Sequence, residues 1–396
     1  MYPKRLAILG GYGNAGMSLA RLLLQWTDVN LCLAGRSPEK AELAAKQLNA
    51  AFSGERVSGA AADAHDSGSL QALFTDVDMV VVASSGADAA GRIADAALRS
   101  GIDYLDILLS TPEKHSALRR LEPELQRQGR CFITDGGFHP GLPAAMVRYA
   151  SQYFLTLRRA RVAGLIRMNW QEYHFSPDTE AEFYREITTQ ELRYYRGGEW
   201  RKAGIFTAGD YPRIDFGSPF GKQYCAPMYL EEINLLARNF PSLEETGFYV
   251  AGLNWFVDWL AFPLAMLRRK WLPGAGDKLL NKLTGWGLRR FSRPPYAAML
   301  QLNADGLSDA GETRFELAVS HRDAYQLTAI PVLACLIQYL TGEIRRPGLW
   351  WMGHLIIPDA FFKLMKRAGA EVRCQLIRPG GQTLPPRNSR PEVLEA

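Results

Sequence analysis

Residues 6–16 read LAILGGYGNAG, and this stretch decides how the amino-terminal part of the chain folds. Its apolar start predicts a buried strand, which leads into Gly11, Gly13 and Gly16 in the spacing G-x-G-x-x-G. A helix-compatible stretch follows from Met17. In such a unit the glycines permit a tight turn, close approach of a pyrophosphate and close helix packing, while the helix N-terminus faces the anion. An ordinary glycine-rich turn is the alternative, but the flanking strand and helix favour a nucleotide site that also includes Asn14 and Ala15.

The end of the second expected strand, 30–34, indicates which nucleotide binds. An NAD site usually has Asp or Glu here to accept hydrogen bonds from the ribose. This chain has Gly35 and Arg36, with Ser37 and Lys40 close by. A guanidinium suits a phosphate dianion because its planar fork donates two parallel hydrogen bonds. The sequence therefore favours NADP(H) over NAD, although Arg36 at the exposed start of a helix is the alternative.

Strands and helices continue to alternate as far as residue 134. The run 78–83 is apolar and rich in valine, as is typical of a strand buried in a parallel sheet. This alternation predicts a doubly wound parallel sheet with Cys131–Thr134 as its last strand. Ligands of such sheets bind outside the carboxyl ends of the strands. The other expected strands are 57–62 and 103–107, and the expected helices are 38–49, 69–74, 89–99 and 112–128.

Composition excludes several classes of protein. The chain has 396 residues, 47% of them hydrophobic, which is enough for a sizeable core and more than one domain. A net charge of +5 is mild at this size, and no nucleic-acid-binding motif is present. The five cysteines are scattered without metal-ligand spacing, so we expect no metal site and a reducing compartment. Without a recognisable signal peptide, the expected location is the cytoplasm.

Polar residues after the later strands are candidates for the chemistry. Reduction of a C=N or C=O bond needs a proton at the heteroatom, so an acid or base is expected near the strand ends. His139 follows a Gly-Gly turn and, by residue type, titrates near neutral pH. A loop histidine that only bonds the backbone is the alternative. Tyr104 and Asp106 share one face of a strand, and they and Asp135 are further candidates to orient or assist the reacting group.

These motifs together resemble the saccharopine dehydrogenase-like oxidoreductases. The resemblance rests on 11–16, on Ala34-Gly35-Arg36, on Tyr104-Leu105-Asp106 and on 137–141. It implies an NADP-binding Rossmann domain, and a second α/β domain that closes over the nicotinamide. Carried over by position, it implies pyrophosphate binding by the three glycines, adenosine-phosphate binding by Arg36, and Ser84 and Ser85 beside the nicotinamide. The run 138–143, FHPGLP, departs from the corresponding loop of saccharopine-forming reductases, which argues against saccharopine itself as the substrate.

Beyond about residue 150 the pattern changes to that of a second, α+β domain. Alternating residues predict strands at 158–168, 298–304 and 313–320, the last two joined as a hairpin. A helix is expected over 181–195, followed by a hairpin turn at 196–200, and the apolar run 327–340 is expected to be a core helix. We therefore expect domains at 1–145 and 146–377, the second for substrate and dimerisation, and a loose tail at 378–396. Four residues of the second domain are further candidates to reach the cleft, with packing or surface roles as the alternative: Tyr173, His174, Glu180 and Tyr184.

The segment 248–271 differs from an ordinary soluble domain. It is aromatic and apolar except for Asn254 and Asp258, and it ends in the basic run Arg268-Arg269-Lys270-Trp271. Asp258 and Pro263 argue against a helix that spans a membrane. A buried helix that lines a pocket or a dimer face is one interpretation. The other is a surface that lies in the lipid interface, with its cations at anionic head groups and peripheral contact with the inner membrane.

The sequence as a whole predicts an NADP-dependent oxidoreductase that works as a homodimer. Hydride would pass between NADPH and a C=N or C=O carbon of a small amino-acid- or amine-derived substrate. One alternative is a reductase of a C=C or carbonyl group on a lipid-like substrate at a membrane surface. A second alternative is an NADP(H)-binding sensor without turnover.

Overall fold

The alternation of strands and helices that follows the glycine-rich loop builds a seven-stranded parallel sheet. In this computed structural model, which describes residues 4–172, 183, 190–204, 207–271, 277–378 and 383–384, the strand order is β15-β6-β5-β4-β1-β2-β3. Its strands are β1 (Arg5–Leu9), β2 (Asn30–Gly35), β3 (Val57–Ala61), β4 (Met79–Val82), β5 (Asp103–Asp106), β6 (Cys131–Thr134) and β15 (Gly348–Trp351). All described pairs in this sheet are parallel. The first six strands have the order of a Rossmann fold, in which the order of strand addition reverses between β1 and β4.

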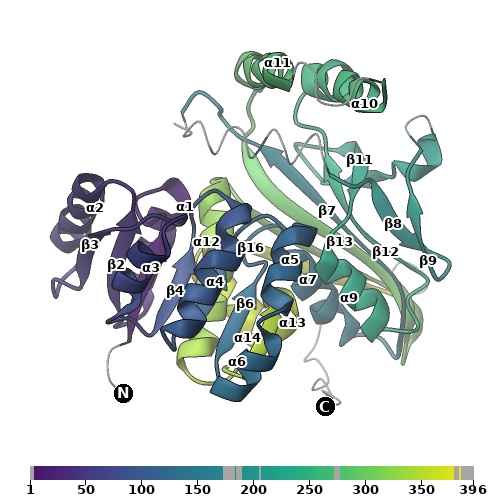
Figure 1. Cartoon of the computed structure of the whole chain (residues 1–396). Coiled ribbons are helices and arrows are strands. Elements are labelled where there is room, and N and C mark those ends of the chain that lie inside the picture. Colours follow the sequence, from purple (N-terminus) through teal and green to yellow (C-terminus); the bar gives the residue numbers. More distant parts are fainter. Residues whose placement is uncertain are drawn as a thin grey trace. The chain divides into compact units, whose positions relative to one another are not determined.

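Helices cover both faces of this sheet. Figure 1 shows α4 in front of it and α12 behind it, and Met79–Val82 of β4 is fully buried, as expected for a strand packed on both faces. The helices are α1 (Asn14–Trp26), α2 (Pro38–Ala51), α3 (Ser67–Phe74), α4 (Ala90–Arg99), α5 (Pro112–Arg119), α6 (Glu122–Gln128), α12 (Ala324–Leu340), α13 (Met352–Leu355) and α14 (Pro358–Arg367). A short 3₁₀ turn, Ala87–Ala89, precedes α4.

Two features of this sheet differ from the sequence prediction. Cys131–Thr134 is not the last strand, because β15 pairs in parallel with it from more than 200 residues further along the chain. β15 is short and aromatic, so it carries no strand periodicity. The expected helix 112–128 is two helices, α5 and α6, because Pro123 would break a continuous helix. Pro123 instead lies in the first turn of α6, where a missing N–H costs no hydrogen bond within the helix.

The chain divides into two compact units, and the division differs from the expected domains. The first unit is Met1–Ala145 with Tyr325–Gly369, and the second is Met146–Ala324 with Ala370–Ala396. Residues 325–369, which the sequence analysis placed in the second domain, thus belong to the first unit, because they supply α12, β15 and the helices that follow. The boundary at residue 145 falls within α7 (Leu142–Ser151).

The second unit contains a mixed sheet of long strands. Its main path is β10-β11-β12-β7-β13-β14-β16-β17, and β8 pairs with β12 and β9. Only β7 and β12 pair in parallel among the described neighbours. The strands are β7 (Thr156–Arg167), β8 (Arg193–Arg196), β9 (Glu199–Lys202), β10 (Arg213–Asp215), β11 (Lys222–Met228), β12 (Glu245–Ala251), β13 (Ala297–Ser308), β14 (Gly311–His321), β16 (Glu371–Ile377) and β17 (Thr383–Leu384). The helices are α9 (Glu231–Asn239), α10 (Phe262–Trp271) and α11 (Asp277–Phe291), with a 3₁₀ turn at Ala208–Asp210.

Several elements expected in this unit form with different residue bounds. The expected strand at 158–168 and both hairpins form, but residues 193–195 belong to β8 and not to a helix, and most of 181–192 lies outside the described residues. Thr383–Leu384, expected in the loose tail, pairs with β16. Of the remaining residues in 378–396, only 378 is described.

The apolar segment 248–271 is not one helix. Residues 248–251 end β12, where Phe248 and Tyr249 are buried and paired on both sides. A π-helical turn, Val257–Ala261, then leads into α10. No helix within the described part of the chain is both long and apolar enough to cross a membrane.

Candidate functional site

The glycine-rich loop connects β1 to α1 in a tight turn at the carboxyl edge of the parallel sheet. The N–H groups of Gly10 and Gly11 donate to Ala34 O of β2 at 2.8 and 3.1 Å, and Gly13 N donates to Gly10 O at 3.0 Å. A Cβ at Gly16 would lie 2.3 Å from Gly10 O, so only glycine permits this approach. Gly13 and Asn14 are exposed at the start of α1, where helical N–H groups have no partner within the helix. This geometry can hold a pyrophosphate.

Tyr12 joins this loop to the end of β2. Its hydroxyl accepts a hydrogen bond from Ser37 N at 3.1 Å, and its ring covers Gly35, where a Cβ would lie 2.5 Å from Tyr12 Cε1. Ser37 Oγ in turn accepts from Lys40 N at 3.3 Å and caps α2. Arg36 and Lys40 are exposed beside this cap. Two cations thus flank the position where an adenosine phosphate is expected.

The loop after β4 lies against the same turn. A Cβ at Gly10 would come within 2.6 Å of Ser84 N, so the backbones of the two loops touch. Ser84 and Ser85 are partly exposed there. The structure therefore brings together the three glycines, the end of β2 and the two serines at the reversal point of the sheet, where Rossmann folds bind nucleotides.

A buried charged cluster lies at the ends of β5 and β6. Lys114 Nζ is 2.8 Å from Asp106 Oδ1 and 2.6 Å from Asp135 Oδ1, and all three side chains are fully buried. Lys114 Nζ also donates to Leu108 O at 3.1 Å. Lys114 is supplied by the first turn of α5, whose start is set by the N-cap Thr111. The ammonium therefore ties two strand ends to the helix between them.

His115 and two hydroxyls complete this cluster. His115 Nε2 lies 3.0 Å from Asp135 Oδ1, and Ser110 donates to Asp135 Oδ2 at 2.8 Å. Thr134 donates to Asp106 Oδ2 at 2.7 Å. Burial alone would raise the pKa of Asp135, but the nearby Lys114 and His115 outweigh it and hold this pKa below its ordinary range. Burial likewise works against charge on Lys114, yet the two carboxylates raise its pKa, so the ammonium stays charged.

Tyr104 is buried at the edge of the same cluster. Its hydroxyl has no hydrogen-bond partner of normal geometry among the described residues. Burial, and after it the negative charge of Asp106, raises the pKa of Tyr104 well above its ordinary value. Tyr104, Asp106 and Asp135 are thus close together, as their positions on neighbouring strands suggested, but none is exposed. They can position neighbouring groups, and none meets a substrate in this arrangement.

His139 lies on the loop that follows Asp135. Gly136 N donates to Asp106 O at 2.8 Å, and Leu142 N donates to Gly137 O at 3.2 Å, so the cluster and the loop are linked through the backbone. The imidazole stacks edge-on against Phe138 and is partly exposed. Its surroundings desolvate it and lower its pKa to about 4. The ring is therefore neutral at pH 7, in contrast to the titration near neutral pH expected from residue type.

Lys114 and His115 were not among the residues predicted from the sequence. Their signal is weak but readable: the run Thr111-Pro112-Glu113 marks a helix N-terminus directly after a strand that ends in Asp106. Residues in the first turn of such a helix face the carboxyl edge of the sheet. A lysine there, beside two strand-end carboxylates, predicts an ion pair.

The family of this fold follows from comparison with known proteins. Residues 6–133 match the saccharopine dehydrogenase NADP binding domain. The match runs from β1 to β6 and leaves out only the first residue of β1, Arg5, and the last residue of β6, Thr134. This part of the chain is a saccharopine dehydrogenase NADP-binding domain. Over 424 aligned positions the chain is 22% identical to the carboxynorspermidine synthase of Vibrio cholerae, covering 93% of this chain and 97% of the relative.

A solved structure extends the likeness in fold. The saccharopine dehydrogenase (L-Glu forming) of Saccharomyces cerevisiae superposes with a TM-score of 0.64 at 16% identity, covering 94% of this chain and all of that one. At this identity the likeness shows the two-domain α/β fold alone. Together with the domain match it confirms, for residues 6–133, the resemblance drawn from the motifs, and the cofactor of this domain is NADP(H).

The residues of this saccharopine dehydrogenase-like site fit NADP(H). The closed turn at Gly16 and the exposed start of α1 suit a pyrophosphate, and the exposed Arg36 and Lys40 suit a further phosphate. Gly11, Gly13, Asn14, Ala15 and Gly16 would hold the first, and Arg36, Ser37 and Lys40 the second. No group of three or more His, Cys, Asp or Glu within the described ranges could hold a metal ion.

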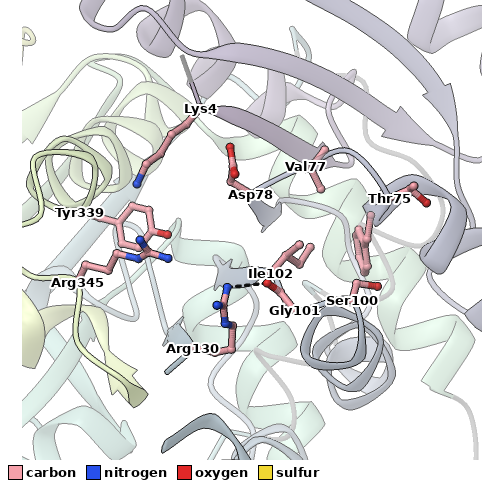
Figure 2. A pocket seen from close by; sticks show the side chains of 11 residues that line it. Lys4, Thr75, Val77, Asp78, Ser100, Gly101, Ile102, Arg130, Tyr339 and Arg345 are labelled. Carbon is pink, nitrogen blue, oxygen red and sulfur yellow. Dashed lines mark hydrogen bonds between the residues drawn. The ribbon is translucent and has the colours of Figure 1, made fainter. Parts of the chain in front are cut away.

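A separate polar pocket of about 180 Å³ lies at the opposite edge of the NADP-binding sheet. It is lined by residues that precede strands, among them Lys4, Asp78 and Arg130, with Tyr339 and Arg345 on α12 and beyond (Figure 2). Arg345 Nε donates to the buried Asp103 at 3.0 Å, and Tyr339 also donates to this carboxylate. Because it faces the amino ends of the strands, this pocket is not the nucleotide site.

Tyr173, His174, Glu180 and Tyr184, weighed as additional cleft residues, lie outside the described residues.

Proposed function

We propose that this chain is an NADPH-dependent reductase that acts on the C=N bond between a small aldehyde- or ketone-derived carbon and an amine of amino-acid or polyamine type. The observation that carries the proposal is the alignment with carboxynorspermidine synthase along nearly the full length of both chains. That relative's name denotes synthesis of a carboxylated polyamine, in which carbon and nitrogen are joined. The departure of the 138–143 loop from saccharopine-forming reductases agrees with a substrate other than saccharopine.

The chain's residues would contribute binding, orientation and a proton path. NADPH, when bound, would supply a hydride to the imine carbon, and uptake of a proton by the nitrogen would complete a secondary amine. His139 is the candidate residue for the proton. Because its pKa is about 4, it is neutral at pH 7 and would relay a proton rather than release one from an imidazolium. Asp106, Lys114 and Asp135 would hold the loops on either side in place.

The experiment is a test of co-dependence. NADPH oxidation is followed with a panel of small aldehydes and keto acids, with a panel of diamines and amino acids, and with both panels combined. The proposal expects turnover with a carbonyl compound and an amine together, and none with either alone. Turnover with the carbonyl compound alone would show C=O reduction and contradict the proposal.

A lipid-like substrate is the second candidate function. It is favoured by the large apolar side chains that the π-helical turn before α10, α10 itself and α11 expose, among them Trp259 and Leu279. A C=C or carbonyl group on an acyl chain would then be the site of reduction. NADPH oxidation that requires an acyl compound, with no response to amines, would establish it in place of C=N reduction.

The homodimer expected from the sequence stays a prediction. Sedimentation velocity of the full chain would show a species of twice the mass of 44.2 kDa if it holds.

A further inference from the structure

Large apolar side chains are exposed on the two consecutive helices α10 and α11 and on the turn before them. Trp259 and Leu279 are each 74% exposed, and Trp255 is 59% exposed. The full set of such residues on these helices is Trp255, Trp259, Leu260, Leu264, Leu267, Leu279 and Trp286. They are seven of the twelve large hydrophobic residues that the described part of the chain exposes. Singly exposed leucines are ordinary, but a concentration of this kind marks an interaction surface.

The inner side of the same segment is firmly packed, so the exposure is not a sign of a loose segment. Phe256 stacks on Phe291 with ring centroids 5.1 Å apart, and Trp286 packs against both rings. Phe256, Val257, Ala261 and Leu288 form a buried cluster with Trp170. These contacts join the π-helical turn before α10 to α11.

The polar residues of the segment are occupied on this inner side. Asn254 Oδ1 accepts from Phe256 N and Val257 N at 3.1 and 3.0 Å and so caps the turn, and its amide reaches Ser292 Oγ at 3.3 Å. Asp258 Oδ1 accepts from Leu253 N at 2.9 Å. Asn254 and Asp258 are thus bonded within the protein, whereas Trp259 and Leu260 are exposed.

The net charge of this segment is positive. Residues 255–293 contain eight Lys or Arg and two Asp, a surplus of six, whereas the whole chain has a surplus of five. The rest of the chain therefore carries a net charge of −1. Lys282, Arg290 and Arg293 are exposed on or beside α11. Apolar side chains and cations on the same helices are the combination that binds an anionic lipid surface.

We infer that α10 and α11 form a lipid-docking surface, which rests on anionic phospholipid head groups and inserts Trp259, Leu260 and their neighbours into the interface. A second copy of the chain is a poorer occupant, because it would bring two faces of the same positive charge together. This inference stands apart from the proposed reaction, since it rests on residues outside the NADP(H) site.

The test is flotation of the full chain with vesicles. Two compositions are used, phosphatidylcholine alone and phosphatidylcholine mixed with phosphatidylglycerol, each at low and at high salt. We expect the protein to float with the mixed vesicles at low salt and to stay behind with phosphatidylcholine alone. High salt should release it, because screening weakens attraction between exposed charges.

Matched variants separate this surface from general stickiness. Trp259→Ser with Leu260→Ser should abolish flotation, while Leu43→Ser with Leu155→Ser, two equally exposed leucines elsewhere, should not. Lys282→Gln with Arg290→Gln and Arg293→Gln should weaken binding about 100-fold, because each cation near an anionic surface contributes about 1 kcal/mol. Lys202→Gln with Lys222→Gln and Lys366→Gln is the control for charge. NADPH affinity checks that each variant is folded.

Two results would overturn the inference. The native chain could remain in the soluble fraction with the mixed vesicles, or Trp259→Ser with Leu260→Ser could float like the native chain. If that variant also converted a dimer to a monomer in sedimentation, this face would be a self-association surface. Flotation and NADPH oxidation are measured separately. A failure to float would therefore not contradict the proposed reaction, and a failure to oxidise NADPH would not contradict lipid docking.

Discussion

Arg36 is the residue that we propose as the determinant of cofactor choice. It is exposed at the end of β2, where an acidic residue would bind the ribose of NAD, and Lys40 lies one helical turn further on. Arg36→Asp removes a charge-assisted hydrogen-bond donor and adds a repelling charge, so NADPH binding should weaken by about 2–4 kcal/mol. NADH, which lacks the phosphate, should bind about as well as before. Fluorescence titration measures both, and Lys46→Asp, on the exposed face of α2, is the control. Equal native affinities for the two cofactors would contradict this role.

His139 is the residue that we propose for the proton path. His139→Asn should lower turnover by about 10²–10⁴-fold, the usual size of acid–base assistance, and leave NADPH affinity nearly unchanged. Because the pKa of His139 is about 4, protonation of this residue should cause no change in the activity of the native protein near pH 6.5. The pH profiles of the native protein and of the variant should therefore have the same shape in this range. Steady-state kinetics across pH measures both effects. Unchanged turnover would leave His139 with a packing role against Phe138.

Residue types alone predict the glycine-rich loop and the residues proposed to bind the nucleotide, but they do not predict the charged cluster. Glycine spacing has one strong structural meaning when a strand precedes it and a helix follows, so the loop at 11–16 could be read directly. Lys114 is a different case, since most lysines are exposed and only the fold brings it between Asp106 and Asp135. Likewise, the low pKa of His139 arises from desolvation, which residue type cannot reveal.

At the scale of elements, α5 is anchored to β5 and β6 by the Lys114 ammonium. Lys114→Met keeps the length of the side chain but leaves two buried carboxylates without their cation, so unfolding free energy should fall by about 3–5 kcal/mol. Urea denaturation measures the loss. Lys114→Met with Asp135→Asn should lose less than the single variant, because one of the unpaired charges is gone. The exposed Lys366→Met is the control, and an equal effect of Lys114→Met and Lys366→Met would contradict the assignment.

The turn before α10 should make stability depend on pH. Burial raises the pKa of Asp258 to about 6, above its unfolded value, so the folded state binds the extra proton more readily. This contribution is fully present below the unfolded pKa of about 4 and is lost as pH rises through 6. Asp258→Asn should therefore stabilise the protein at pH 8, by up to about 2 kcal/mol after allowance for partial exposure, and change little at pH 4. Thermal unfolding at both pH values measures it. Asp76→Asn, on the surface, should show no such difference.

Element boundaries were predictable where periodicity was strong. The strands and helices up to residue 110 follow from apolar runs and end close to their expected residues. β15 has four residues and no alternation, so its place beside β6 depends on long-range pairing that local sequence does not encode. The segment 248–271 looked uniform in hydropathy, yet its first four residues belong to a strand because β7 and β11 pair with them.

At the scale of the whole molecule, the chain leaves the NADP-binding unit after residue 145 and returns to it at 325. Most of the second unit thus lies in the chain between β6 and β15 of the Rossmann sheet, and the rest, from Ala370 on, follows β15. Sequence patterns show where strand periodicity changes, but they do not show that a later segment rejoins an earlier sheet. This is why the sequence predicted the fold class and the cofactor, and assigned 325–369 to the wrong unit.

The fate of the transferred hydride distinguishes C=N reduction from the other candidate reactions. NADPH carrying deuterium at the transferred position of C4 is incubated with the chain, a carbonyl compound and an amine that together support turnover, and the product is analysed by mass spectrometry. The account predicts a secondary amine with one deuterium on the carbon bound to nitrogen. Deuterium recovered in an alcohol, or in a reduced acyl chain, would contradict it.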